Sequence, residues 1–120
     1  MQTFNMRHDI TGRHSGERVV ITGGVDDGST VAFSVAKATM GQIATHVKTS
    51  GGVQPHNMRH DSVGGGVVTT FNMRHDVVVA GSADGGVSVS GAADVDGQPQ
   101  PLQVRFTLDQ AGVSGLAHLA

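Results

Sequence analysis

Glycine-containing turn signals recur along the whole chain and confine it to short segments. Asp26-Asp27-Gly28, Asp84-Gly85-Gly86 and Asp96-Gly97 combine residues that readily adopt the backbone angles of tight turns. Between the turns, apolar and polar side chains alternate, most regularly over residues 102–108, and such alternation is typical of a half-buried strand. About eight short strands, spaced roughly 8–12 residues apart, predict an all-β fold, either a small antiparallel barrel or a sandwich.

Length and composition predict one domain with a modest core. A chain of 120 residues is expected to form a single all-β domain over residues 1–120, because two domains of half that size would each be marginal. Eighteen glycines and four phenylalanines, with no tryptophan or tyrosine, leave a core made mainly of valine and small residues. Such a core buries little apolar area per residue, so we expect a partner or an extensive hydrogen-bonded sheet to add stability.

The charges are balanced and spread along the chain. Eight basic and ten acidic residues give a net charge of −2, and no basic stripe carries interleaved aromatic residues, so we expect no nucleic-acid partner. No stretch approaches 18 consecutive apolar residues, so we expect no membrane span. The absence of cysteine excludes disulfides and thiol chemistry and leaves the redox compartment open.

Three stretches are less regular than the rest. Residues 11–18 are polar and contain two glycines, which predicts a loop before a strand at residues 18–22. That strand and residues 29–35 flank Asp26-Asp27-Gly28, so they are expected to form a hairpin. Residues 37–47 are the one helix candidate, but a glycine and several β-branched residues favour a bent strand pair there. Residues 113–120 are expected to form a short last strand or a frayed tail.

One pentapeptide, Asn-Met-Arg-His-Asp, occurs three times without change, at residues 5–9, 57–61 and 72–76. The flanks differ, although a phenylalanine precedes the first and third copies. Identical segments in dissimilar flanks indicate a unit that selection or design has copied. On a strand, Met6 and His8 would share one face, because side chains alternate between faces. The sequence leaves open whether the second copy, which follows a proline, forms a strand.

The Met-x-His spacing gives each copy two candidate metal ligands. A thioether and an imidazole two residues apart on a strand lie roughly 7 Å apart at the backbone and favour copper, above all Cu(I). In the simpler alternative, this face is buried or half-buried, and the Asn, Arg and Asp side chains form cross-strand hydrogen bonds and ion pairs worth on the order of a few tenths of a kcal/mol each. If the three copies converge, the ligands of the predicted metal site are Met6, His8, Met58, His60, Met73 and His75.

Two further stretches resemble a known family. Residues 25–35 are similar to the opening of YceI-like domains, in which an Asp, a Ser and an alternating Val-x-Phe-x-Val begin the barrel. Residues 87–106 resemble the closing hairpin of that family, in which glycines and a proline lead into the last alternating strand. Members are lipocalin-like barrels that enclose an isoprenoid chain, so the resemblance implies a carrier of an apolar small molecule. The implied ligand-binding face comprises Val31, Phe33, Val35, Phe71, Val104 and Phe106.

The familiar catalytic and nucleotide-binding motifs are absent from the sequence. We therefore predict a non-enzymatic binding or structural module that carries no cofactor. Three forms of it stay open: a carrier of an apolar ligand such as an isoprenoid or lipid, a copper-type metal-binding protein, and a designed or self-assembling β scaffold without an evolved ligand. In the third form, exposed strand edges bearing identical segments would pair across chains into a homo-oligomer.

Overall fold

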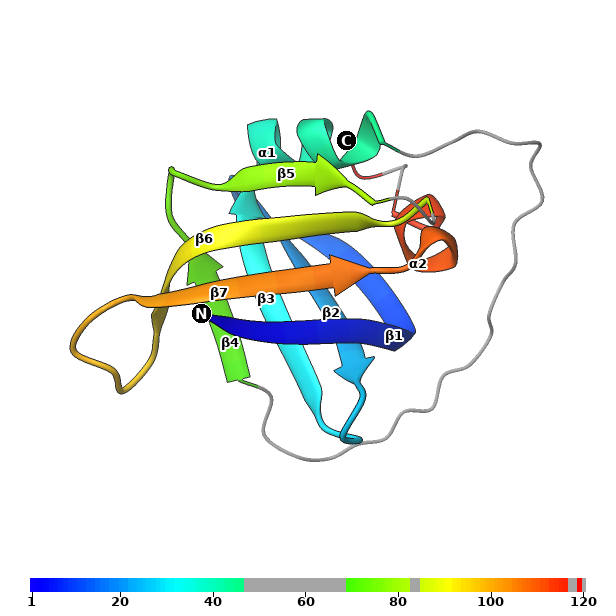
Figure 1. Ribbon diagram of the computed structural model, residues 1–120. Helices are drawn as coiled ribbons and strands as arrows, with labels where there is room; N and C mark the ends of the chain where they lie inside the picture. Colours follow the sequence, from blue (N-terminus) through cyan, green and yellow to red (C-terminus); the bar gives the residue numbers. More distant parts are fainter. Residues whose placement is uncertain (47–68, 83–84, 117–118, 120) are drawn as a thin grey trace.

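The computed structural model describes residues 1–46, 69–82, 85–116 and 119 of the chain. These residues form seven strands and two helices, and six of the strands close into a small barrel (Figure 1). The predicted all-β barrel is thereby confirmed. In chain order the elements are β1 (Gln2–Ser15), β2 (Arg18–Val25), β3 (Thr30–Ala36), α1 (Lys37–Ala44), β4 (Thr69–Met73), β5 (Val78–Gly81), β6 (Val87–Val95), β7 (Leu102–Leu108) and α2 (Gln110–Ser114).

The barrel closes because β4 pairs with β3 on one side and with β6 on the other. The order of neighbours is β4-β3-β2-β1-β7-β6, and the pairing of β4 with β6 completes the ring. β5 continues beyond β4 along the same edge of β6. The sheet is mixed rather than wholly antiparallel, since β1 runs parallel to β7 and β3 runs parallel to β4. Alternation within a strand carries no information on the direction of its neighbours, so the sequence pattern does not predict these two parallel pairs.

The two halves of the barrel repeat one order of elements. The first half consists of β1, β2, β3 and α1. In the second half, β4 together with β5 corresponds to β1, β6 to β2, β7 to β3, and α2 to α1. The pairing agrees at the level of residues: Phe4 lies opposite Phe106 in the β1–β7 pair, and Phe71 lies opposite Phe33 in the β4–β3 pair. The first strand of each half is therefore paired with the last strand of the other half, and the two halves interlock.

The predicted hairpin around Asp26-Asp27-Gly28 is confirmed as β2 and β3. Gly28 has φ 92°, a left-handed angle that glycine adopts at little cost. β2 continues past the predicted end of its strand, because Gly23 and Gly24 form strand pairs with β3 rather than a turn. A Cβ at Gly23 would lie 2.9 Å from the Met6 side chain, so glycine allows close packing there.

The loop predicted for residues 11–18 is wrong. β1 continues to Ser15, turns through Gly16 at φ 63° and pairs with β2 from Arg18 onward. The side chains of this arm are mostly exposed, which explains why they are polar. Backbone pairing with β2, which needs no apolar side chain, holds the segment as a strand.

The bent strand pair predicted over residues 37–47 is also wrong, because residues 37–44 form the helix α1. Met40 and Ile43 lie three residues apart and are both buried. Gly41 lowers helix propensity by about 1 kcal/mol relative to alanine, and burial of the apolar pair against the barrel offsets that cost.

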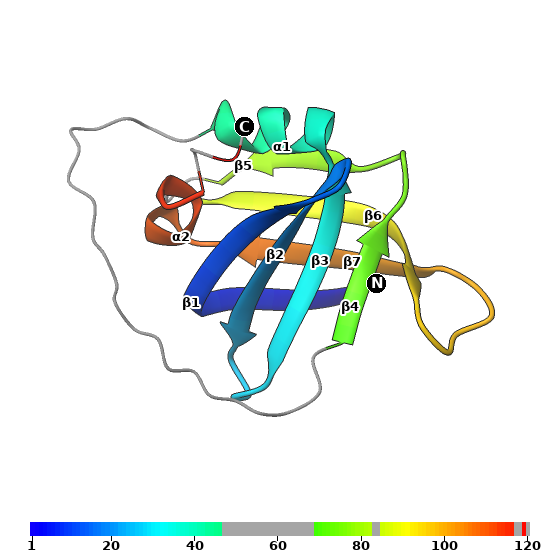
Figure 2. The same ribbon diagram turned by 180° about the vertical axis from the view of Figure 1, so that it is seen from behind.

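The short last strand or frayed tail predicted over residues 113–120 is wrong at its start, because residues 113 and 114 belong to the helix α2, which spans residues 110–114. The carboxylate of Asp109 accepts a hydrogen bond from the Gly112 N–H at 2.9 Å and caps the helix. Val113, Leu116 and Leu119 recur every three residues and are buried, so this apolar series is helical rather than strand-like. The two helices lie near each other beside the barrel (Figure 2).

Four phenylalanines meet in the core of the barrel. Phe33 and Phe106 are fully buried and stacked, with ring centroids 4.4 Å apart. Phe4 lies 5.1 Å from Phe71 and 5.3 Å from Phe106. Each half contributes one ring from its first strand and one from its last, so this cluster joins the two halves.

Neither helix that the structure describes has the length and apolar character of a membrane-spanning helix.

Candidate functional site

The first copy of the pentapeptide lies where β1 bends (Figure 2). The pairing of β1 with β2 shifts register between Met6 and His8 and again between His8 and Thr11. Asp9 has φ 53°, in the left-handed region that residues other than glycine seldom adopt. The bend breaks the alternation, so Met6 is buried while His8 is exposed. The predicted common face for these two side chains is therefore wrong.

The third copy lies at the corresponding corner of the other half. β4 ends at Met73, opposite Ala93 of β6, and the chain resumes pairing with β6 at Val78, opposite Ser90. Arg74, His75 and Asp76 form the exposed link between the two strands. Both described copies thus occupy the point at which the first strand of a half changes direction.

The Asn side chains of the two copies make matching contacts. The Asn5 amide oxygen accepts a hydrogen bond from the Thr107 hydroxyl at 2.7 Å. The Asn72 amide oxygen accepts one from the Ser34 hydroxyl at 2.8 Å. In each case the hydroxyl belongs to the parallel neighbour, directly opposite the Asn in the ladder. The first residue of the pentapeptide therefore joins the two halves.

The Arg side chains also form matching ion pairs. The Arg74 Nη2 lies 2.9 Å from an Asp94 carboxylate oxygen and its Nε donates to the same oxygen at 3.1 Å. The hydrogen bond and the charge of Asp94 raise the pKa of Arg74. The Arg7 Nε lies 3.6 Å from Asp26, a looser contact between exposed groups. These contacts match the simpler alternative, in which polar members of the copies form cross-strand bonds and ion pairs.

Among the described residues, the predicted metal ligands do not form a single group. Met6 and Met73 are buried, while His8 and His75 are exposed at the two corners. Within the described ranges, no three His, Asp or Glu side chains are grouped so that they could hold a metal ion. Two of the six predicted metal ligands, Met58 and His60, lie outside the described residues.

The six residues predicted to line an apolar-ligand site are all buried in one cluster. Phe106 contacts both Phe33 and Phe71, with ring centroids 4.4 and 5.4 Å apart. Their side chains pack against one another in the barrel core. The residues concerned are Val31, Phe33, Val35, Phe71, Val104 and Phe106.

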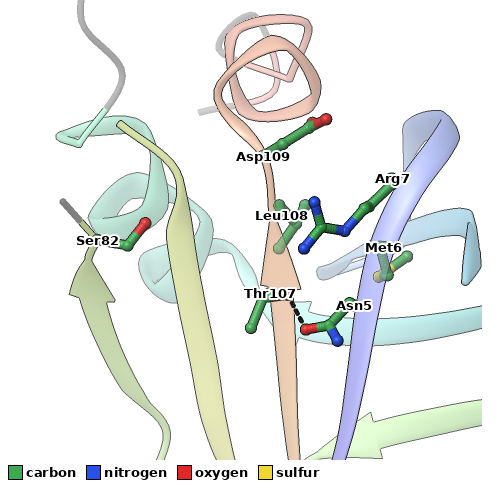
Figure 3. A pocket seen from close by; sticks show the side chains of 7 residues that line it. All are labelled: Asn5, Met6, Arg7, Ser82, Thr107, Leu108 and Asp109. Atoms are coloured by element: carbon green, nitrogen blue, oxygen red, sulfur yellow. Dashed lines mark hydrogen bonds between the residues drawn. The ribbon is translucent and has the colours of Figure 1, made fainter. Parts of the chain in front are cut away.

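A polar pocket opens between β1 and β7 beside the first copy (Figure 3). Its volume is about 220 Å³, well above the roughly 10–15 Å³ that a cavity needs, on the same measure, to hold one water molecule. Met6 and Leu108 line it as buried apolar residues, 0% and 2% exposed, while the other lining side chains are polar or charged. The lining residues are Asn5, Met6, Arg7, Ser82, Thr107, Leu108 and Asp109.

Several of these polar groups are held in place by neighbouring residues. Thr107 and Asn5 bond each other across the floor of the pocket, as the dashed line in Figure 3 shows. Asp109 is oriented by its capping bond to Gly112. The pocket therefore presents hydroxyl, amide and carboxylate groups that neighbouring residues hold in position, together with the more exposed guanidinium of Arg7.

Sequence reasoning did not predict this pocket, although it singled out Met6 for another role. The available signal was Asp109, whose spacing to Gly112 is that of a helix cap. A second signal was the identity of the first and third copies of the pentapeptide. Its meaning becomes clear only when the strand pairing is known. Searches of family models, curated proteins and solved structures find no significant match to this chain, so its resemblance to YceI-like domains rests on the quoted residues alone.

Proposed function

We propose that this chain is a non-enzymatic binding module, in which the barrel is the scaffold and the pocket between β1 and β7 takes a small polar molecule. The observation that carries the proposal is the pocket itself, lined by polar groups that both strands hold in place. Binding sites of this kind combine an apolar surface with a few fixed polar groups. Met6 and Leu108 are the buried apolar residues of the lining, and Asn5, Thr107 and Asp109 supply the polar groups.

The packing of the core favours this surface pocket over the barrel interior. The interior phenylalanines stack at distances typical of aromatic pairs, which contribute about 0.5–1.5 kcal/mol each beyond their burial. An apolar ligand inside the barrel would have to separate Phe33 from Phe106. A ligand in the pocket would leave these contacts intact.

The test is a two-dimensional amide NMR spectrum of labelled chain, recorded with a panel of small polar fragments. We expect saturable shifts at Met6, Arg7 and Leu108. The variant Arg7→Ala should change the response, whereas Arg74→Ala should preserve it, because Arg74 occupies the corresponding corner but does not line the pocket.

Native mass spectrometry of the same sample separates the other hypotheses. A lipid that co-purifies in the mass spectrum, together with NMR amide shifts confined to Val31, Phe33 and Phe106, would contradict binding in the pocket. It would favour the apolar carrier. Stoichiometric copper uptake, abolished when His8, His60 and His75 are replaced together, would favour the metal hypothesis. A chain that takes up no fragment, lipid or metal would leave the structural scaffold.

A further inference from the structure

The two halves of the barrel differ at one corresponding position. Ile21 lies opposite Phe33, and Val89 lies opposite Phe106, so these pairs correspond between the halves. Three residues before Ile21 in β2 lies Arg18, and three residues before Val89 in β6 lies Gly86. Arg18 and Gly86 therefore occupy corresponding positions in the two halves. Arg18 pairs with Ser15, and the Ser82 N–H donates to the Gly86 carbonyl at 3.0 Å, which agrees with this correspondence. One half therefore carries an arginine side chain where the other carries a hydrogen.

Arg18 fills a half-buried position between β3 and β4. Its Nε donates to the Ser34 hydroxyl at 3.0 Å, and its Nη2 donates to the Ser34 carbonyl at 2.9 Å. The same Nη2 donates to the Met73 carbonyl at 2.7 Å. One guanidinium thus binds three acceptors that two parallel strands present together.

The pocket lies at the corresponding place between β7 and β1. Thr107 corresponds to Ser34, and Met6 corresponds to Met73. Both Thr107 and Met6 line the pocket. The Thr107 hydroxyl donates to Asn5, just as the Ser34 hydroxyl donates to Asn72 while accepting from Arg18. Since a hydroxyl oxygen has two acceptor lone pairs, Thr107 can play both parts as well.

We propose that this pocket binds a guanidinium group, supplied by another molecule at the place where Arg18 supplies one within the chain. The Thr107 hydroxyl is the acceptor that the pocket lining presents, at the place of the Ser34 hydroxyl in the other half. The proposal rests on the pocket being a binding site, as proposed above, and it names the chemistry of the ligand. A planar guanidinium suits this arrangement because its donors form a rigid fork, whereas an ammonium is a point charge.

The charges around the pocket are compatible with a cation. Asp109 adds a carboxylate at the wall, at the position that the uncharged Ala36 occupies in the filled half. Arg7 is the opposing charge. In the half that contains Arg18, the counterpart of Arg7 is Arg74, which is held by Asp94, while the Arg18 guanidinium binds the Met73 carbonyl. That half therefore accommodates two guanidinium groups side by side. Asp26 is already within 3.6 Å of Arg7 and can hold it in the same way.

The first experiment titrates labelled chain with methylguanidinium, using methylammonium at equal concentration as the control for charge. We expect saturable amide shifts at Met6, Thr107 and Leu108 with methylguanidinium only. Two further arms distinguish the source of the group: free L-arginine, and an acetylated Gly-Arg-Gly amide, each compared with its lysine equivalent. Tighter binding of the peptide would identify the ligand as an arginine side chain of a partner, and tighter binding of the free amino acid would identify a metabolite.

Two variants test the correspondence itself. In Gly86→Arg the new side chain should fill the pocket and weaken methylguanidinium binding by at least about tenfold, since it competes for the same acceptor. In Arg18→Ala a second pocket should open, and methylguanidinium should raise the thermal midpoint of this variant more than that of the parent chain.

The outcomes separate this inference from the broader proposal. If methylguanidinium and methylammonium give equal shifts, or if Gly86→Arg binds as well as the parent, the guanidinium inference is overturned. If other polar fragments still shift the pocket amides in that case, the proposed binding function stands. If no fragment of any kind shifts them, both fail.

Discussion

At the scale of single residues, the four phenylalanines determine how the two halves hold together. Phe106 is fully buried and lies within 5.4 Å of each of the other three rings, whereas Phe4 is only half-buried. In a chain without tryptophan or tyrosine, these four are the only aromatic residues, and Phe33 and Phe106 are the largest fully buried side chains among the described residues. Loss of the central ring should therefore cost more than loss of the outer one.

We predict that Phe106→Ala lowers the free energy of unfolding by about 3–5 kcal/mol, the usual cost of removing a buried phenylalanine. Phe4→Ala, the matched control within the same cluster, should cost distinctly less because that ring is half-exposed. Urea denaturation followed by circular dichroism measures both. Equal costs for the two variants would show that Phe106 is not the centre of the cluster.

At the scale of elements, the β2–β3 turn and the start of α2 show how short polar segments set the ends of strands and helices. Asp27 accepts hydrogen bonds from the Ser29 N–H at 2.9 Å and the Ser29 hydroxyl at 2.6 Å. These bonds, led by the hydroxyl, lower the pKa of Asp27 from its usual 3.8. Asp109 plays the comparable part for α2, as its capping residue.

The turn makes a prediction about acid stability. A carboxylate whose pKa is lowered on folding stabilises the folded state above its unfolded pKa, and this contribution is lost as the pH falls through the lower folded value. In Ser29→Ala, the pKa of Asp27 should return toward 3.8. A carboxyl-detected NMR titration of both chains gives this pKa directly, and an unchanged value would show that the Ser29 hydroxyl is not its main cause.

The cap of α2 gives a second prediction at this scale. Asp109→Ala should lower stability by about 1 kcal/mol, because the Gly112 N–H loses its acceptor. Asp109→Asn is the matched control, since an asparagine side chain caps helices about as well. Thermal unfolding of the three chains compares them. An equal loss for both variants would mean that the negative charge, not the hydrogen bond, is what matters.

Elements differed in how far the sequence could predict them. The alternation in β7 and the Asp-Asp-Gly turn are local signals, and both predictions are confirmed. α1 was mistaken because Gly41 and the β-branched residues are weak helix formers, while the burial of Met40 and Ile43 depends on the rest of the barrel. The pocket depends on the parallel pairing of β1 with β7, which joins residues about a hundred positions apart and leaves no local pattern.

At the scale of the whole molecule, the interlocking of the halves is the dominant feature. The parallel pairs β1–β7 and β3–β4 each join one half to the other, as do the phenylalanine cluster and the bond from Arg18 to Met73. Either half alone would expose two strand edges and split the core. Unpaired edges and small cores are both unfavourable for an isolated fragment.

We predict that fragments covering residues 1–46 and 69–120 are unfolded when separate and form the barrel when mixed. The mixture should regain the β-type circular dichroism spectrum and elute at the size of the intact chain. A mixture of the two fragments in which one of them carries Phe33→Ala or Phe106→Ala is the matched control and should recover less. A fragment that folds cooperatively by itself would contradict the interlocked arrangement.

The parallel pairing of β1 with β7 also determines how the barrel would respond to tension. Gln2 lies beside Val104 and Met6 beside Leu108, so the two strands advance side by side over five residue pairs. A force that separates Met1 from Asp109 would pull these strands in opposite directions along their length. Their hydrogen bonds would then be loaded together in shear rather than opened one after another, and the seam that joins the halves would be the mechanical clamp of the molecule.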